Sequence, residues 1–537
     1  MLYDITSQIN AILWSTPLVI FILLVGGIYS LRMKFPQLRL VKDQIKILIG
    51  GKSSSSGISS FQGFAMVLGG RVGVGAIAGV ATAIYYGGPG SIFWMWVAAI
   101  LGASVTFGES TLGQLFKEKF GGEYAGGPAF YMKKGIRNKR LGIALSMLYA
   151  VIAVIAPMIT GPTVQAFNIA DSMHAAFGID YVVIGAAIAI LFAVVTFGGV
   201  KRIGTVASVL VLFMGIAYIV LALVILVLNA PQIPGMFGLI FSSAFGMNAV
   251  YGGLIGSAVM WGIKRALYAS DAGTGQGAHA SSATEVSHPV KQGLAESFSV
   301  YVVAIFICTA TALMILSTGC YNVIQETTGA MVTENLPGVG VGSAYVQAAI
   351  NTLIPGAGPM FVAIAVLLFA FTTLMAFGFM IEANISYLMG DHPFRKAAVL
   401  IGRIICTVVI FFSCLITAEV AWNMADIGVA LMAWTNLVPW CCFRIWWSRP
   451  FGTMSAKRSW AWTRCLILMK WESKARSFGR RSSERTTRIW KQRNRKNRSP
   501  SRPNREIGAQ GSFAAEGGNS IWIQTGARSA LKRSLGS

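Results

Sequence analysis

The feature that most constrains this chain is a series of apolar stretches, each about as long as a bilayer is thick. A helix of about 20 residues spans the hydrocarbon core. We count eleven such stretches, centred roughly on 11–31, 61–86, 91–115, 142–166, 180–199, 205–229, 240–263, 297–318, 357–380, 397–418 and 420–440. Only 12% of the 537 residues are charged, against about 25% in soluble proteins. The sequence predicts an all-α polytopic membrane protein with about eleven transmembrane helices.

Basic residues alternate between the loops that join these stretches. They follow the first, third, fifth, seventh and ninth stretches, and examples are Arg32, Lys34, Lys133, Lys134, Lys201, Arg202, Lys264, Arg265, Arg395 and Lys396. The loops between them contain no Lys or Arg. Because cytoplasmic loops are enriched in Lys and Arg, we expect a multi-pass protein of the cytoplasmic membrane. Its N-terminus is expected outside and its C-terminus in the cytoplasm.

Two of the stretches are interrupted by glycine, which destabilises a helix interior. One contains Gly69–Gly75 and the other Gly252–Ser257. They lie five stretches apart and start on opposite sides, which indicates two inverted five-helix repeats plus one extra N-terminal helix. Transporters of that layout bind substrate at broken helices near the midplane. An alternative is that these glycines only allow close helix packing. The predicted parts are 1–58 (N-terminal helix and basic loop), 59–236 and 237–440 (the repeats), and 441–537 (a tail).

Several gapless segments carry a specific resemblance. They are FQGFA (Phe61–Ala65), Gly69–Trp96, Trp261–Leu294, Thr309–Leu316 and the LLFAFTTLMAF run with Glu382 and Asn384. Together they resemble the alanine/glycine:cation symporters, or sodium:alanine symporter family, over about residues 1–438. The resemblance implies the broken-helix, inverted-repeat fold of the amino acid–polyamine–cation group. It also implies sodium-coupled uptake of alanine or glycine, sometimes with protons, and no organic cofactor.

The candidate substrate site follows from what a zwitterionic amino acid needs. Backbone N–H groups at a half-helix N-terminus can receive its carboxylate, and a small apolar pocket suits an alanine methyl. The predicted substrate-binding residues are Gly73, Val74, Gly75, Ala76, Gln165, Gly253, Ser257, Trp261 and Phe371. Gln165 has an alternative role as a hydrogen-bonding link between helices.

Sodium requires oxygen ligands, which unwound carbonyls supply in this fold. By that analogy, the candidates are Gly69, Val72, Thr372 and Thr373. The two threonines have an alternative role in capping their own helix or bonding to a neighbouring one. No other metal is expected, since the four histidines lack metal-binding spacing; we expect them in solvated loops.

Three ionisable residues, Arg71, Glu109 and Glu382, fall within the apolar stretches. Such residues mark functional or structural pairs. We expect a structural role in which Arg71 pairs with Glu109 or Glu382. The glycine-rich segment Gly273–Gly277 lacks the ending of a phosphate-binding loop.

The chain departs from the pattern that the resemblance implies at two places. Ala76 stands where the family usually has Asn, and Val303-Ala304 stands where it usually has Asp-Thr. The first change removes a polar side chain from the expected substrate site, and the second removes a carboxylate at the start of the eighth stretch. Transport competence and selectivity therefore stay open.

Residues 441–537 change character abruptly. They hold 22 of the 44 Lys and Arg but 4 of the 20 Asp and Glu. Back-translation can be done in the frame that joins the last base of each codon to the first two bases of the next. In that frame, the tail can encode a peptide that resembles the cytoplasmic end expected for the family. We therefore interpret the tail as the product of a frame change near Val438–Trp440, and we expect it to be disordered.

The leading interpretation is a sodium-coupled symporter of alanine or glycine that works by alternating access. We expect the lipid bilayer as a partner and no nucleic acid. Proton coupling and the preference for L or D substrate stay open. The alternatives are a passive channel or facilitator, or a transport-defective product of the frame change. An enzyme is excluded because the sequence shows no nucleophile–base pair and no metal cluster.

Overall fold

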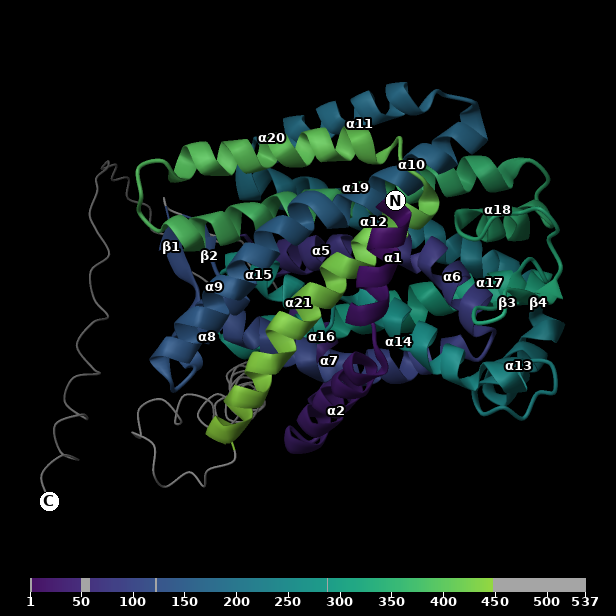
Figure 1. The fold of residues 1–537 in the computed structure, drawn as a ribbon, viewed down its shortest axis with the longest axis horizontal. Coiled ribbons are helices and arrows are strands. Elements are labelled where there is room, and N and C mark those ends of the chain that lie inside the picture. The colour runs from purple at the N-terminus through teal and green to yellow at the C-terminus, as the bar shows by residue number, and fades with distance from the viewer. Residues whose placement is uncertain (1, 50–57, 121–122, 287, 448–537) are drawn as a thin grey trace, which may run out of the picture. The chain divides into compact units, whose positions relative to one another are not determined.

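The computed structural model describes residues 2–49, 58–120, 123–286 and 288–447, which form a mostly helical unit (Figure 1). By length and composition, six of the described helices can cross a membrane, and the bent pair α1–α2 would make a seventh. The fold class is therefore confirmed as helical, while the count of eleven spans and the inverted repeats stay predictions. Residues 448–537, which include most of the basic tail, lie outside the described residues.

The first half of the chain contains the predicted stretches as helices and helix pairs. The elements are α1 (Leu2–Leu13), α2 (Thr16–Arg32), α3 (Pro36–Arg39), α4 (Val41–Ile49), α5 (Ser60–Arg71), η1 (Val74–Ala76), α6 (Ala78–Gly87), α7 (Ser91–Phe116), β1 (Glu118–Phe120), β2 (Glu123–Ala125), α8 (Pro128–Gly135), α9 (Lys139–Ile155), η2 (Ala156–Thr160), α10 (Gly161–Phe177), α11 (Tyr181–Thr196) and α12 (Gly199–Leu228). Helices α9 and α10 join through η2 into one apolar span.

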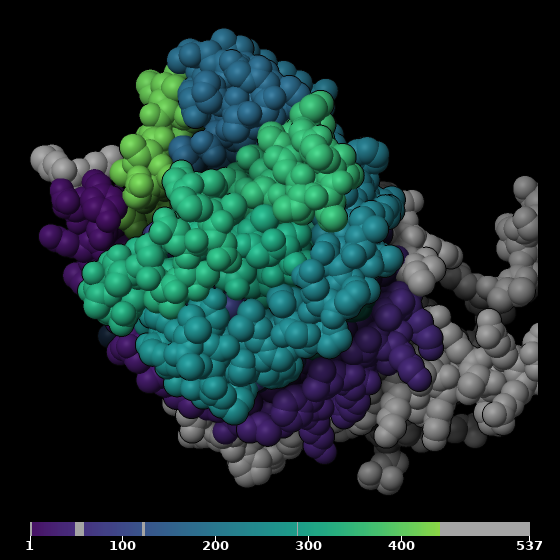
Figure 2. Space-filling model, turned by 90° about the vertical axis from the view of Figure 1, so that its right-hand side faces the viewer, coloured from purple at the N-terminus to yellow at the C-terminus, as the bar shows by residue number. Residues whose placement is uncertain are grey.

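The second half begins at η3 and ends in the long helix α21. Its elements are η3 (Ala230–Gln232), α13 (Ile233–Ala244), η4 (Gly252–Leu254), α14 (Ile255–Ser270), α15 (Gln276–Ala283), α16 (Pro289–Val300), η5 (Tyr301–Ile307), α17 (Cys308–Thr318), β3 (Asn322–Gln325), β4 (Ala330–Glu334), α18 (Ser343–Asn351), α19 (Ala357–Met389), α20 (Arg395–Ser413) and α21 (Ala418–Trp447). The strands form two antiparallel hairpins, β1–β2 and β3–β4, on opposite sides of the unit (Figure 1). Figure 2 looks onto the β3–β4 side, where the green segment around α18 lies across the middle.

Local sequence explains where several of these helices begin and end. Ser59 and Gln62 form a capping box at the start of α5, which satisfies two otherwise free N–H groups. Asn138 and Asp180 cap α9 and α11, since their side chains accept hydrogen bonds from backbone N–H groups of the first turn. Gly178 and Gly319 end α10 and α17 in the left-handed conformation, which costs glycine little.

One predicted break lies elsewhere in the structure. The span that begins with Gly252–Ser257 runs without interruption from Ile255 to Ser270 and is broken at residues 271–275. Gly253 and Gly256 are exposed, and an added Cβ would meet no atom within 4 Å at either. The prediction of a break at Gly252–Ser257 was therefore wrong: the break is in the Asp271–Gly275 segment, where Gly273 and Gly275 take φ values of +96° and +81°.

A buried ion cluster ties α14 to α21. The Asp426 carboxylate lies 3.0 Å from Arg265 Nη1 and 2.8 Å from Lys264 Nζ. Arg265 and Asp426 each expose only 2% of the side chain. Removing one partner of such a buried pair leaves an uncompensated charge, which costs far more than the pair contributes.

We therefore predict that Asp426→Asn lowers the free energy of unfolding by about 3–5 kcal/mol. Thermal unfolding of the detergent-solubilised protein measures the change. Glu382→Gln is the matched control, because Glu382 pairs with Arg403 at 2.5 Å but is 23% exposed; its loss is expected to be about 0–1 kcal/mol. Equal losses in the two variants would contradict a dominant role for the Asp426 cluster.

Candidate functional site

Two interrupted helices meet at the centre of the unit. Helix α5 ends at Arg71 and α6 begins at Ala78, while α14 ends at Ser270 and α15 begins at Gln276. The breaks are adjacent, since a Cβ added to Gly75 would lie 2.8 Å from the ring of Tyr268. The predicted break at Gly69–Gly75 is thus present and faces a second break that the sequence analysis had not placed there.

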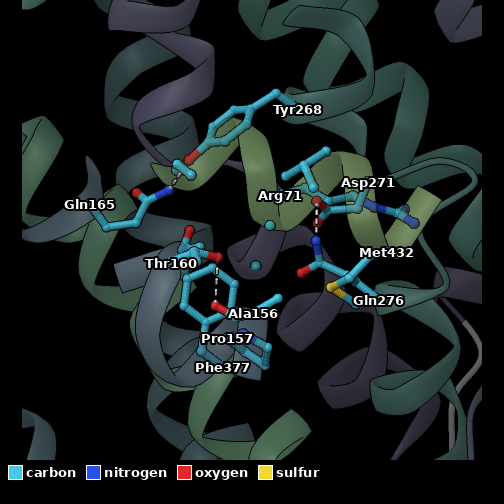
Figure 3. Close-up of a pocket in the computed structure, with 17 residues that line it drawn as sticks. Arg71, Ala156, Pro157, Thr160, Gln165, Tyr268, Asp271, Gln276, Phe377 and Met432 are labelled. Atoms are coloured by element: carbon cyan, nitrogen blue, oxygen red, sulfur yellow. Dashed lines mark hydrogen bonds between the residues drawn. The ribbon is translucent and has the colours of Figure 1, made fainter. Parts of the chain in front are cut away.

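The two breaks enclose a cavity of about 30 Å³ (Figure 3), which is room for one or two water molecules. Helices α5, α10, α14, α19 and α21 contribute to its wall. Its lining residues are Gly70, Arg71, Gly73, Ala156, Pro157, Thr160, Gly161, Gln165, Tyr268, Asp271, Gln276, Thr373, Phe377, Ala425, Gly428, Val429 and Met432.

The cavity has charged, polar and apolar walls. Arg71 and Asp271 lie on one side, where Gln276 Nε2 donates to Asp271 Oδ1 at 3.0 Å. Gln165 and Thr160 lie opposite them, and Pro157 and Phe377 lie at the apolar end (Figure 3). The lining thus combines a few convergent polar groups with apolar surface, as small-molecule sites commonly do.

Gln165 holds the first break in place. Its Oε1 accepts a hydrogen bond from the Val74 N–H at 3.1 Å, and its Nε2 donates to the Tyr268 hydroxyl at 3.1 Å. The alternative of a link between helices is therefore observed, and the same side chain lines the cavity.

At Gly73, the backbone of the first break lies tightly against side chains of α10 and α19. An added Cβ there would lie 2.6 Å from Thr373 Oγ1 and 2.8 Å from Gln165 Oε1. Both distances are shorter than any normal contact of a Cβ atom, so only glycine fits at this position without movement of the neighbours.

Four oxygens gather where α5 meets α19. The hydroxyls of Thr372 and Thr373 donate to the Gly69 carbonyl at 2.9 and 3.0 Å. They also donate to the Phe369 carbonyl at 2.8 and 3.3 Å. Val72 is the first residue after α5 and is buried. Both alternative roles of the threonines, bonding within their own helix and bonding to a neighbouring one, are thus present. The two hydroxyls and the carbonyls of Gly69 and Phe369 also form a group of oxygens that suits a hard monovalent cation.

Among the described residues, Arg71 forms an ion pair with neither of its predicted partners, Glu109 and Glu382. Arg71 Nη1 donates to the Glu296 carbonyl at 3.1 Å and to the Ser299 hydroxyl, and Glu109 interacts with it electrostatically. Glu382 pairs instead with Arg403. The error arose because Glu382 lies on the side of α19 that faces α20, and sequence spacing alone cannot assign a helix face to a partner.

Two of the nine predicted substrate residues, Gly73 and Gln165, line the cavity. The other seven are not among the described residues that line it: Val74, Gly75, Ala76, Gly253, Ser257, Trp261 and Phe371. Gly253 is exposed and Ser257 half-buried at the start of α14, and Phe371 is buried in α19. Val74, Gly75 and Ala76 are buried in the turn η1 beside the cavity.

Trp261 belongs to an aromatic and ionic column between the cavity and the β3–β4 hairpin. The Tyr268 ring, which lines the cavity, lies 5.6 Å from that of Trp422, and the Arg265 guanidinium lies 4.3 Å from the same Trp422 ring. Trp261 stacks on Tyr86 at 4.3 Å and its Nε1 donates to Glu326 Oε2 at 2.7 Å. These contacts close the cavity toward that side.

The sequence analysis missed several buried polar residues. Asp271 and Glu296 are 8% and 0% exposed, and His279 is fully buried rather than solvated. His279 Nε2 lies 2.8 Å from Asn384 Nδ2. Asp271 and His279 lie beside the break at Asp271–Gly275, so locating that break would have brought both into consideration.

The two departures from the family pattern lie in neighbouring turns. Ala76 is in η1, while Val303 and Ala304 are in η5, which contacts η1. All three side chains are fully buried, and the Thr311 hydroxyl donates to the Ala76 carbonyl at 2.9 Å.

Comparison with known proteins identifies close relatives. The family model described as the sodium:alanine symporter family matches residues 1–449. A putative sodium/proton-dependent alanine carrier, YrbD of Bacillus subtilis, is 46% identical over 81% of this chain and 89% of its own length. The sodium/proton-dependent alanine carrier of Bacillus sp. PS3 is 46% identical over 73% of this chain and 87% of its own.

A solved structure of a Na⁺-coupled sialic acid symporter also matches. It has a TM-score of 0.44 and 12% identity, and the match covers 80% of this chain and 86% of that one.

The geometry of Gly73 leads to a direct prediction. Gly73→Ala forces Gln165 or Thr373 to move, and overpacking of this kind costs about 1–3 kcal/mol. Gly79→Ala in α6 is the control, because its Cβ would meet no atom closer than 3.8 Å. Thermal unfolding is expected to show a lower midpoint for Gly73→Ala only; equal midpoints would contradict the tight approach.

Proposed function

Because this chain belongs to the sodium:alanine symporter family, a family of transporters and not of enzymes, we propose that it is a sodium-coupled symporter of alanine and glycine. The observation that carries the proposal is the cavity between two broken helices, which has charged, polar and apolar walls. No covalent bond is made or broken.

The substrate is held by complementary ends of the cavity. The N–H groups that precede α6 donate hydrogen bonds to the carboxylate, helped by the positive end of the helix dipole. The Asp271 carboxylate and the Thr160 hydroxyl accept hydrogen bonds from the ammonium group. The apolar end at Pro157 and Phe377 accepts a hydrogen or a methyl group, which favours glycine and alanine over amino acids with larger side chains.

Sodium binds to the oxygens of Gly69, Val72, Thr372 and Thr373. This site joins the half-helix α5 to α19, so an ion there stabilises the geometry of the break that receives the substrate. Binding of one ligand then favours binding of the other, which is the thermodynamic basis of coupling.

Transport requires the cavity to open to each side in turn. The column of Tyr268, Trp422, Arg265, Trp261 and Tyr86 closes the path toward the β3–β4 side. We assign that side to the exterior, because the segment 319–356 carries no Lys or Arg while basic residues follow α2 and α8. Rocking of one helix bundle against the other opens the two paths alternately.

A passive channel or facilitator is the competing function. It differs in one measurable respect, since it cannot accumulate substrate above equilibrium. The proposal is tested with labelled alanine and proteoliposomes that contain the full chain, with and without an inward sodium gradient. Sodium-driven accumulation supports symport, and equilibration without accumulation supports the facilitator.

The sodium site gives a sharper prediction. Thr373→Val removes one oxygen and keeps the side-chain shape, and loss of a hydrogen-bond-strength contact to a charged group costs about 1.5–3 kcal/mol. The sodium concentration for half-maximal alanine uptake is therefore expected to rise by about tenfold or more. Thr407→Val is the control, since the Thr407 hydroxyl bonds to Arg403 O in α20. An unchanged sodium requirement in Thr373→Val would remove this residue from the site.

A further inference from the structure

A group of buried ionisable side chains beside the cavity contains more acidic than basic groups. Glu109, Asp271 and Glu296 all interact electrostatically with Arg71. The side chains expose 2% (Arg71), 1% (Glu109), 8% (Asp271) and 0% (Glu296) of their surface. If all were ionised, three negative charges would face one positive charge. No ion pair within 4 Å joins Arg71 to a carboxylate in the described part of the chain.

The ion cluster on the other side of the cavity has no such imbalance. There, Lys264 and Arg265 face Asp426, and Glu326 accepts a hydrogen bond from Trp261 next to them. Lys264 also interacts electrostatically with Glu326. Two cations thus meet two carboxylates, so the excess of negative charge is specific to the Arg71 group.

Asp271 accounts for part of the excess. It lines the main cavity and a second one of about 20 Å³ that continues toward α15, so water or a substrate ammonium can compensate its charge. Glu109 and Glu296 are not among the described residues that line either cavity. These two carboxylates therefore share the single charge of Arg71, and one of them needs a further cation, because an uncompensated buried charge is neutralised in practice.

A proton is the cation that suits these carboxyl groups, because it needs only one carboxyl oxygen. The sodium ion of the proposed function is assigned to other oxygens, those of Gly69, Val72, Thr372 and Thr373. Among the described residues, no group of three or more His, Cys, Asp or Glu side chains that could hold a metal ion is found.

Hydrogen bonding distinguishes the two carboxyl groups. Glu109 Oε1 accepts from the Asn436 amide, and the Gly273 backbone also interacts with this carboxylate; such donors favour the ionised form. Glu296 Oε1 accepts from Gln292 on its own helix. The Oε2 atoms of both carboxyl groups lack a hydrogen-bond partner among the described residues. The two groups therefore differ in the donors that interact with them, which are Asn436 and Gly273 for Glu109 but Gln292 alone for Glu296. Glu296 is therefore the better proton acceptor.

Arg71 connects Glu296 to the part of the chain expected to move. It is the last residue of α5 before the break, it lines the cavity, and it donates to the Glu296 carbonyl. Helix α15 packs directly on the guanidinium, since a Cβ added to Gly277 would lie 2.6 Å from Arg71 Nη2. A shift of α5 during transport would change the distance between Arg71 and Glu296, and with it the affinity of Glu296 for a proton.

Other titratable groups nearby do not supply the missing charge. On α15, His279 Nδ1 lies 3.2 Å from the Gly275 carbonyl oxygen, and its Nε2 lies 2.8 Å from Asn384 Nδ2. Tyr131 and Tyr149 interact with Glu109, and Tyr301 begins η5 next to α16. On α3 and α4, which also pack against α16, the charged residues are exposed: Arg39, Lys42, Asp43 and Lys46.

We propose that Glu296 binds a proton in the occluded protein and that one proton moves with each substrate molecule, in addition to sodium. This inference rests on the proposed symport and assigns its proton to a residue.

The test uses proteoliposomes that contain the full chain, with a fixed sodium gradient and a series of imposed pH gradients. For one coupled proton, the equilibrium accumulation ratio of alanine is expected to change about tenfold for each pH unit across the bilayer. Glu296→Gln is expected to abolish this dependence and to keep sodium-driven accumulation. Glu382→Gln, which alters a carboxylate with its own arginine partner, is expected to keep the full dependence.

Several outcomes would overturn the assignment. One is a wild-type protein that accumulates alanine with sodium but shows no dependence on the pH gradient. Another is a tenfold dependence that survives in Glu296→Gln. If Glu296→Gln does not fold, Glu296→Asp replaces it; this variant is expected to keep the dependence with a shifted pH midpoint for uptake, and an unshifted midpoint counts against the proposal. Failure of sodium-driven accumulation in the wild type would instead reject the proposed function itself.

Discussion

The structure depends on satisfying the backbone groups that two broken helices leave free inside a membrane. Water cannot satisfy them there, so each unpaired N–H or C=O costs several kcal/mol. Side chains from other helices provide the partners. Gln165 accepts from the Val74 N–H, Thr372 and Thr373 donate to the Gly69 carbonyl, and Asn436 donates to the Gly273 carbonyl. These bonds fix α10, α19 and α21 around the breaks, and the cavity lies between them.

The same bonds place the transport chemistry. Gln165 and Thr373 satisfy the first break and line the cavity, so a ligand that enters must compete with or extend these contacts. In the proposed function, a sodium ion at Gly69 and Thr373 acts on the same backbone that receives the substrate carboxylate. This shared backbone gives the two ligands a physical means of influencing each other, without any long-range pathway.

Two charged clusters flank the cavity and differ in kind. The cluster of Lys264, Arg265, Asp426 and Glu326 has two cations and two carboxylates, and its Arg265–Asp426 and Lys264–Asp426 pairs join α14 to α21. The Arg71 cluster carries an excess of carboxylates and adjoins the moving end of α5. A compensated cluster stabilises a closed contact, whereas an uncompensated one is suited to gaining and losing a cation as its surroundings change.

The sequence by itself determined the helical membrane class, the break at Gly69–Gly75 and the family, because long apolar stretches and gapless motifs are local properties of the chain. It also pointed to Gln165, Thr372 and Thr373, whose polar groups are conspicuous in apolar surroundings. Only the tertiary structure decided which helices face one another. It moved the second break from Gly252–Ser257 to Asp271–Gly275, paired Glu382 with Arg403 and brought Glu296 next to Arg71. Such pairings join residues up to hundreds of positions apart, and they depend on how helix faces are oriented, which the spacing of residues along one helix cannot specify.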